Sequence, residues 1–202
     1  MPTPRKRSPS PKSGSRRTAF RRCFDEQILP IRLEPLENGM GMKLVWTQPI
    51  SELDLHHVLP IFFSGVSETQ DPYQFAAVDG LFQLLETCSG KQLLAVVPEL
   101  IQHIKDGLNT KNTMVTCNVL RAIQQLAVSG PGIVGALAKS YHKFLPAFNI
   151  LRVKRGKGGS GTAVANLVDE TLEILEMNGD ENSFRQLRKM IPNYQSCMLY
   201  SA

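Results

Sequence analysis

A short proline motif occurs three times in this chain and constrains its fold more than any other feature. Each copy contains two apolar residues, a proline, any residue and a further apolar residue. The copies are Val58-Leu59-Pro60-Ile61-Phe62, Val96-Val97-Pro98-Glu99-Leu100 and Phe144-Leu145-Pro146-Ala147-Phe148. Their prolines are 38 and 48 residues apart, and one armadillo or HEAT unit spans roughly 40–47 residues. The spacing therefore indicates one structural unit that is used three times.

The surroundings of each proline predict what this unit is. Each copy lies within an apolar pattern of helical spacing and is followed by a second helical segment. A proline starts or kinks a helix because it lacks an N–H and its ring clashes with the preceding turn. A pair of helices cannot bury its apolar face alone, so such units must stack. We therefore predict an all-α, HEAT/armadillo-like solenoid over residues 51–202.

Hydrophobic periodicity and turn residues give the expected helices of this solenoid. Leu94, Val97 and Ile101, for example, have helical spacing. Ser89-Gly90 and Ser129-Gly130-Pro131-Gly132 are expected to end helices. The predicted helices lie near 54–67, 72–87, 91–108, 112–128, 131–151, 163–177 and 181–190.

A lead-in segment, residues 19–50, is expected to precede the solenoid. Ala19 to Phe24 predicts a short helix, and two short alternating runs around residues 31–33 and 43–46 predict a small β ribbon or an extended flap. Two strands alone are marginally stable, so we expect this piece to lie on the helices. Trp46, the only tryptophan in the chain, is expected to anchor it there.

The net charge of +5 conceals an uneven distribution. Residues 1–22 contain eight basic residues and no acidic one, whereas the remainder has 15 basic and 18 acidic residues. Residues 1–18 are rich in Pro, Ser and Gly and are predicted to form a disordered basic arm. Such arms bind polyanions. The basic residues are Arg5, Lys6, Arg7, Lys12, Arg16, Arg17, Arg21 and Arg22.

Two serines of the arm precede prolines. Ser8-Pro9 and Ser10-Pro11 have the form of sites for proline-directed kinases. Phosphate there would reduce the positive charge of the arm. The alternative is an unmodified linker.

A glycine-rich loop is the main indication of nucleotide chemistry, and its context argues against that function. Residues 156–161 match GxGxxG, but a dinucleotide fingerprint needs a preceding strand and a parallel βαβ unit. Here the preceding residues are expected to be helical. The loop is also basic, through Arg152, Lys154, Arg155 and Lys157. It is either a solvated connection or a second contact for an acidic partner.

No other motif predicts catalysis or a bound cofactor. His56-His57 lacks a set of further ligands, and adjacent residues point to different sides of a helix, so a structural role or a partner contact is favoured. The four cysteines form no CxxC pair, which predicts reduced thiols in an intracellular protein. No secretory signal and no apolar stretch of about 18 residues is found, so we expect no membrane span. We expect a protein that is not an enzyme.

Several segments closely resemble the parkin co-regulated gene protein family over about residues 20–199. The paired-histidine segment and the ending Pro-x-Tyr-x-Ser-Cys are specific to that family. The matching residues include Leu53-Asp54-Leu55-His56-His57-Val58-Leu59-Pro60, Pro72-Tyr73-Gln74-Phe75, Val97-Pro98-Glu99-Leu100-Ile101, Glu170-Thr171-Leu172-Glu173 and Ile191-Pro192-Asn193-Tyr194-Gln195-Ser196-Cys197.

The resemblance implies a helical solenoid of the ciliary or flagellar axoneme. It implies a place at the inner junction of doublet microtubules, where the protein would bridge the B-tubule wall to the A-tubule. The implied partners are α/β-tubulin, a small β-rich inner-junction protein and other axonemal inner proteins, with the basic arm on the microtubule lattice. The loop at 152–162 is shorter here than in many family members, so a contact made by a longer insert is not carried over.

A second hypothesis is a nucleic-acid-associated adaptor that uses the same basic arm. Binding of this kind would ignore sequence and weaken steeply with salt. Only Phe20 and Phe24 are near the basic residues of the arm, so stacking on bases has little support. A nucleic-acid arm should bind as an isolated peptide, whereas a lattice bridge should also need the solenoid.

Overall fold

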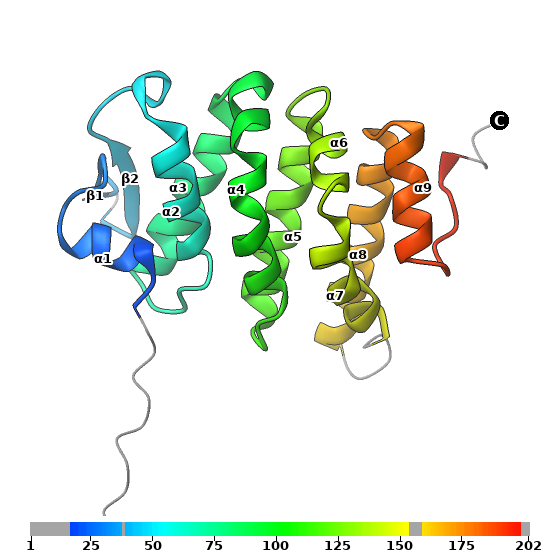
Figure 1. Ribbon diagram of the computed structural model, residues 1–202. Coiled ribbons are helices and arrows are strands. Elements are labelled where there is room, and N and C mark those ends of the chain that lie inside the picture. Colours follow the sequence, from blue (N-terminus) through cyan, green and yellow to red (C-terminus); the bar gives the residue numbers. More distant parts are fainter. Residues whose placement is uncertain (1–16, 38, 154–158, 199–202) are drawn as a thin grey trace, which may run out of the picture.

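The computed structural model describes residues 17–37, 39–153 and 159–198, apart from the side chain of Ser160. Within this part the protein is mostly helical with one small sheet (Figure 1). The elements are α1 (Ala19–Asp25), β1 (Ile31–Pro35), β2 (Met42–Trp46), a 3-10 turn η1 (Ile50–Glu52), α2 (Leu55–Gly65), α3 (Tyr73–Thr87), α4 (Gly90–Leu108), α5 (Thr113–Val128), α6 (Ile133–Ala138), α7 (Tyr141–Val153), α8 (Gly159–Met177) and α9 (Glu181–Met190).

The helices from α2 onward form two layers (Figure 1). Pairs of successive helices, α2 with α3, α4 with α5 and α7 with α8, pack across the layers. Within the first layer α4 contacts α2, α6 and α7, and within the second layer α5 contacts α3 and α8. Pro60, Pro98 and Pro146 all lie inside first-layer helices. The prediction that each proline motif lies in a helix and is followed by a second helical segment is therefore confirmed.

Polar side chains cap several helices at the points where the sequence predicts a start. Asp54 accepts a hydrogen bond from the backbone N–H of His56 at the start of α2. Asn112 accepts from Met114 and Val115 at the start of α5, and Asp180 accepts from Ser183 at the start of α9. These caps satisfy N–H groups that have no partner in the first helical turn. The predicted starts of these helices agree with the structure within one residue.

Three local predictions are wrong. The segment 131–151 is not one helix, because a turn at Lys139 and Ser140 separates α6 from α7 and lets both helices pack on α4. Helix α8 begins at Gly159 and not near 163, since its packing against α5 and α7 outweighs the low helix propensity of glycine. Ser89 and Gly90 begin α4 and do not end α3.

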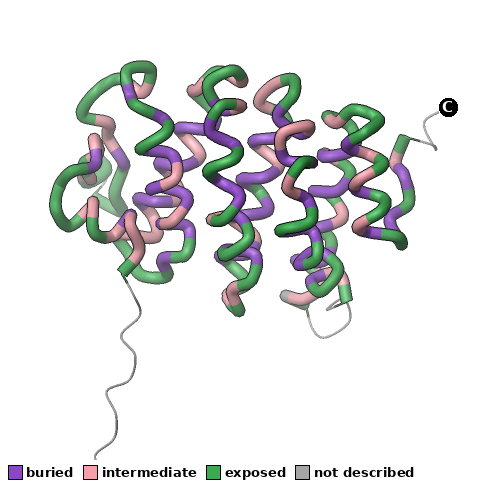
Figure 2. Tube along the Cα trace, viewed as in Figure 1, coloured by how far each residue is buried: buried purple, intermediate pink, exposed green. Residues whose placement is uncertain are grey.

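The lead-in segment packs on the first helix pair. β1 and β2 are antiparallel, with Ile31 opposite Trp46, which confirms the predicted ribbon. The indole N–H of Trp46 donates to Gln83 Oε1 of α3 at 2.7 Å. Its ring centroid lies 5.5 Å from that of Phe62. Trp46 is therefore the predicted anchor. Buried residues recur along the helices of both layers (Figure 2).

Gly80 is the position where α3 approaches a buried aromatic ring of α2 most closely. A Cβ atom at Gly80 would lie 2.2 Å from Cε1 of Phe62, which is fully buried. Gly80→Ala should therefore lower the free energy of unfolding by about 1–3 kcal/mol, because the ring must move within a packed core. Gly135→Ala in α6 is the control, because its Cβ would meet nothing within 4 Å. Urea denaturation of both variants checks this prediction, and equal midpoints would contradict it.

Candidate binding surface at the junction of the basic segment and the helices

Thr18 fixes the point at which the basic N-terminal segment joins the helices. Its hydroxyl oxygen accepts a hydrogen bond from the backbone N–H of Arg21 at 3.0 Å and so caps α1. The same hydroxyl donates to Glu68 Oε1 at 2.6 Å. Glu68 follows α2 and is buried. Since α1 is held in the core by the fully buried Phe20, the end of the segment has a fixed position.

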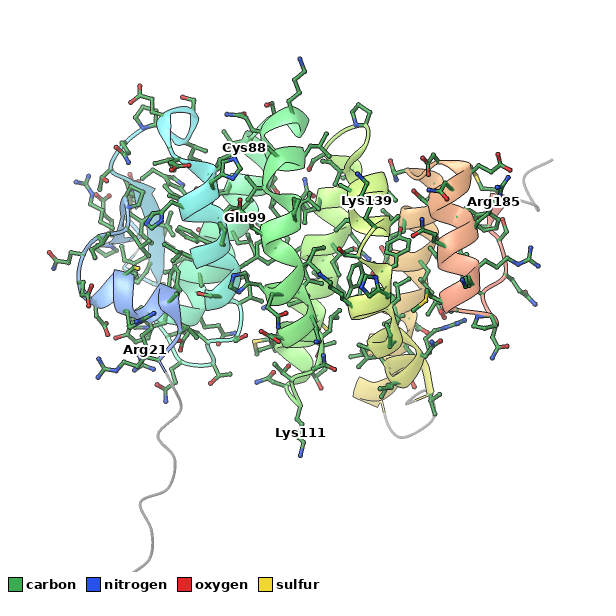
Figure 3. All side chains as sticks on the ribbon, in the orientation of Figure 1. Arg21, Cys88, Glu99, Lys111, Lys139 and Arg185 are labelled. Carbon is green, nitrogen blue, oxygen red and sulfur yellow. The ribbon has the colours of Figure 1, made fainter. Side chains whose placement is uncertain are left out.

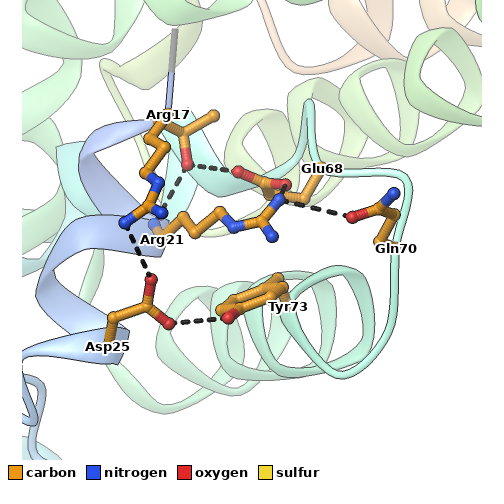
Figure 4. Close-up of polar contacts among 7 residues, drawn as sticks. Arg17, Arg21, Asp25, Glu68, Gln70 and Tyr73 are labelled. Atoms are coloured by element: carbon orange, nitrogen blue, oxygen red, sulfur yellow. Dashed lines mark hydrogen bonds and ion pairs between the residues drawn. The ribbon is translucent and has the colours of Figure 1, made fainter. Parts of the chain in front are cut away.

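Arg21 is held against the turn that connects α2 and α3 (Figure 4). Its Nη1 lies 3.6 Å from Glu68 Oε2 and 3.4 Å from Gln70 Oε1. Its guanidinium carbon lies 4.2 Å from the centre of the Tyr73 ring, which is a cation–π contact. The charge of Arg21 is therefore matched within the chain.

Asp25 completes this cluster from the end of α1. Its Oδ1 accepts a hydrogen bond from the Tyr73 hydroxyl at 2.6 Å, and its Oδ2 lies 3.8 Å from Nη1 of Arg17. The hydrogen bond to Asp25 raises the pKa of Tyr73, because it favours the protonated phenol. The cluster ties α1 to α3 through polar contacts beside the aromatic core.

The predicted tubulin contacts fall into three groups. Arg17 and Arg22 are exposed, although Arg17 approaches Asp25. Arg21 has partners within the chain, so we assign it the role of positioning the segment. The other predicted residues, together with the predicted phosphorylation sites, lie outside the described residues, and they are Arg5, Lys6, Arg7, Ser8, Ser10, Lys12 and Arg16.

The second predicted contact, the glycine-rich loop, is described only at its ends. Nε of Arg152 lies 2.7 Å from Asp169 Oδ1, an ion pair that joins α7 to α8. Lys154, Arg155 and Lys157 lie outside the described residues. Helix α7 precedes this loop, whereas the dinucleotide fingerprint requires a strand there. The described ends of the loop therefore give no support to nucleotide binding.

His56 joins two helices of the first layer. Its Nδ1 lies 2.7 Å from Glu99 Oε1 of α4. This hydrogen bond raises the pKa of His56, although the small loss of hydration opposes it. No group of His, Cys, Asp and Glu side chains able to hold a metal occurs among the residues that the structure describes. The His56–Glu99 contact agrees with the structural role favoured by the sequence.

The His56–Glu99 contact should depend on pH in a defined direction. A raised pKa means that the contact contributes fully below pH 6.5, the ordinary pKa of histidine, and is lost as the pH rises through the raised value. Glu99→Gln should return the pKa of His56 towards 6.5, as measured by an NMR titration of its imidazole. Glu170→Gln, an exposed change on α8, should leave that titration unchanged. An unaltered titration in Glu99→Gln would contradict the assignment.

The C-terminal segment is fixed by one buried carboxylate, which the sequence analysis did not identify. Glu176 Oε2 of α8 accepts hydrogen bonds from the Tyr194 hydroxyl at 2.6 Å and the Cys197 backbone N–H at 3.0 Å. The Ser196 hydroxyl donates to its other oxygen. The family-specific ending Pro-x-Tyr-x-Ser-Cys is thus a set of donors around one acceptor. The only signal was an acidic residue beside the apolar positions Leu172 and Leu175 of α8.

The hydrogen bonds around Glu176 determine its protonation. Burial alone would raise the pKa of this carboxyl, but the bonds donated by Ser196, Tyr194 and Cys197 hold it below its ordinary value. The carboxylate is therefore charged at neutral pH. Burial and the bond to Glu176 raise the pKa of Tyr194, which keeps its phenol protonated.

The four cysteines form no disulfide, as the sequence predicts. Their side chains are all partly buried. Among the described residues, no helix has the length and apolar character needed to cross a membrane.

The fold and these contacts define a mostly helical protein of layered helix pairs, whose polar clusters join helices to each other and to both terminal segments. The chain belongs to the Parkin co-regulated protein family, whose sequence model matches residues 18–196. It is 37% identical over 190 residues to the Parkin coregulated gene protein homolog of Mus musculus. That match covers 90% of this chain and 78% of the mouse protein. The resemblance found in the sequence is confirmed.

Proposed function

We propose that this protein is a non-catalytic structural microtubule-associated protein of the ciliary or flagellar axoneme. It binds α/β-tubulin and bridges the A- and B-tubules at the inner junction of doublet microtubules. Its partners there are a small β-rich inner-junction protein and other axonemal inner proteins. It needs no cofactor, membrane or specific nucleic acid for this role.

Family membership is the observation that supports this proposal most. The family match begins at residue 18 and ends at residue 196, so it includes α1, both helical layers and two of the residues that bind Glu176, Tyr194 and Ser196. The family-specific His56 and Tyr194-to-Cys197 segments make intramolecular contacts. Their geometry supports a scaffold role for these residues.

The layered helix pairs support a HEAT/armadillo-like solenoid as the form of this scaffold. In such a stack each pair mainly contacts its neighbours, and the outer helix faces make extended binding surfaces. Side chains project from the helices on the side of the molecule that Figure 3 shows. A protein that repeats along a polymer can sum many weak contacts of this kind.

The basic segment supports binding to an acidic lattice. Tubulin has an acidic surface, and eight basic residues without an acidic one occur in residues 1–22. The contacts of Thr18, Arg21 and Asp25 fix the point at which the basic segment joins the helices. The basic segment and the outer faces of the helices are therefore available to the same partner. A bridge needs such a combination, whereas a nucleic-acid arm does not.

Microtubule co-sedimentation tests the proposal. The full chain and a variant without residues 1–16 are compared over a salt series, with RNA as a competitor. The truncation ends at residue 16 because Thr18 caps α1 and Phe20 is fully buried. We expect binding by the full chain that survives RNA and weaker binding by the truncated chain. No pelleting of the full chain at low salt, even with the inner-junction partner present, would overturn the proposal.

A comparison of two variants that each lose three positive charges distinguishes binding by the N-terminal segment from general electrostatic attraction. Arg5→Ala, Lys6→Ala and Arg7→Ala together remove three positive charges from the segment. Lys111→Ala, Arg121→Ala and Lys139→Ala remove three exposed charges from the helical body, two in turns between helices and one on α5. Equal loss of microtubule binding in both variants, or complete loss with RNA, would favour general polyanion binding and the nucleic-acid alternative.

A further inference from the structure

A groove lies between α3 and α5 on the second layer. Its volume is about 590 Å³. Four of its lining side chains are apolar and two are acidic. The apolar ones are Phe75, Val78, Phe82 and Met114, and the acidic ones are Asp71 and Asp79.

The groove leaves apolar surface and negative charge available. Met114 is 54% exposed, and its sulfur accepts a contact from the Gln74 amide across the groove. Asp71 accepts a hydrogen bond from the Phe75 backbone N–H at 3.3 Å, and Asp79 accepts one from the Gln83 amide at 2.8 Å. Neither carboxylate forms an ion pair among the described residues. A ligand with apolar groups and positive charge would complement this surface.

The basic N-terminal segment joins the helices at one end of this groove. Thr18 is bonded to Glu68, and Arg21 is bonded to Gln70. Asp71, which lines the groove, directly follows Gln70. From Asp71 to Phe82 a helix rises only about 16 Å, whereas 16 extended residues reach roughly 50 Å. Residues 1–16 are therefore long enough to follow the groove.

The composition of this segment matches the groove. It contains prolines at positions 2, 4, 9 and 11 and basic residues at 5–7, 12 and 16. Proline-rich peptides bind grooves lined by aromatic side chains, and basic side chains complement Asp71 and Asp79. A tether so close to the groove also gives the segment a high effective concentration there.

We propose that residues 1–16 bind in the α3–α5 groove when the chain has no external partner. The groove then binds the basic side chains of the segment, and an acidic partner must displace the segment from the groove before it can bind those side chains. Phosphate on Ser8 or Ser10 releases the segment, because it adds negative charge opposite Asp71 and Asp79. This inference does not rest on the proposed axonemal role, since it concerns one chain alone.

Methionine methyl NMR on the full chain tests the proposal. Met114 reports on the groove, and Met177 on α8 is a matched control because it is also 54% exposed. Met114→Leu and Met177→Leu assign the two signals. Arg5→Glu, Lys6→Glu and Arg7→Glu together should shift the Met114 signal and leave Met177 unchanged. High salt should shift the Met114 signal of the full chain in the same direction, because it screens exposed charges.

Charge exchange gives the decisive comparison. Asp71→Asn with Asp79→Lys reverses the groove charge, and Asn keeps a side-chain oxygen for the Phe75 N–H. In the chain that carries Arg5→Glu, Lys6→Glu and Arg7→Glu, the two groove changes should return the Met114 signal to its position in the unmodified chain. In the chain with the native segment they should not. A peptide of residues 1–16, added to the chain with the reversed segment and the native groove, should restore it as well. Identical Met114 signals in the full chain and the reversed-segment chain, or no effect of the peptide, would overturn the proposal and leave the groove to an external partner.

Discussion

Replacing Phe62 by alanine should lower the free energy of unfolding by about 3–5 kcal/mol. The Phe62 ring is fully buried, and its centroid lies 5.2 Å from that of Phe20 of α1 and 5.5 Å from that of Trp46 of β2. The backbone of Gly80 of α3 also approaches it. Truncation therefore leaves a cavity where α1, the ribbon and the first helix pair meet, and few neighbours can move to fill it.

Chemical denaturation of Phe62→Ala and Phe82→Ala measures this effect. Phe82 is only partly buried and lines the α3–α5 groove, so the same truncation should cost much less there. We also expect the Trp46 fluorescence of native Phe62→Ala to change, because the indole loses its neighbouring ring. Equal stability of the two variants would show that the lead-in segment is not part of the cooperative core.

Replacing Glu176 by glutamine should lower the free energy of unfolding by about 2–3 kcal/mol. Glutamine has almost the same shape, but its amide nitrogen is a donor and must face Tyr194, Ser196 or Cys197. At least one buried donor then loses its acceptor, and the remaining bonds lose their charge assistance. The segment from Tyr194 to Cys197 should separate from α8 more often than in the native chain.

Two measurements check the Glu176 prediction. Thermal unfolding gives the overall loss of stability, and hydrogen exchange of the Cys197 amide reports on local release, since that N–H donates to Glu176. Glu170→Gln is the matched control, because Glu170 is exposed on the same helix. Slow exchange of the Cys197 amide in Glu176→Gln would show that the carboxylate does not hold the segment.

Lowering the pH should release the segment from Tyr194 to Cys197, as Glu176→Gln does, because acid protonates Glu176. The pKa of Glu176 is lowered from an ordinary value of 4.5, so its contribution to stability is complete above pH 4.5. The contribution is lost as the pH falls below 4.5 and through the lowered folded-state pKa. Exchange of the Cys197 amide should therefore accelerate in acid in the native chain, and much less so in Glu176→Gln.

Local sequence signals predicted most elements because each signal spans about the same few residues as the helix or strand that it predicts. The helical spacing of Leu94, Val97 and Ile101 lies within α4, and the alternation that ends at Trp46 defines a strand within five residues. The turn at Lys139 and Ser140 was missed because the apolar pattern continues through it. Only the packing of α6 and α7 on α4 determines where that segment bends.

The candidate site was predictable only in part. The sequence contains the basic charge of residues 1–22 and the family-specific residues at His56 and near Cys197. It gives no sign that Arg21 is held by Glu68 and Tyr73, because these partners are about 50 positions away in the chain. The pairing of His56 with Glu99 was missed for the same reason.

The sequence by itself determined the helix pairs, the ribbon, the basic segment and the family of this protein. Periodicity, turn residues and charge are properties of short stretches, so they can be recognised without knowing what packs against them. Only the tertiary structure decided which polar groups meet, including Glu176 with the C-terminal donors, and which helix faces border the α3–α5 groove. These features depend on the stacking of helices that are distant in sequence, because burial and hydrogen bonding are settled between neighbours in space.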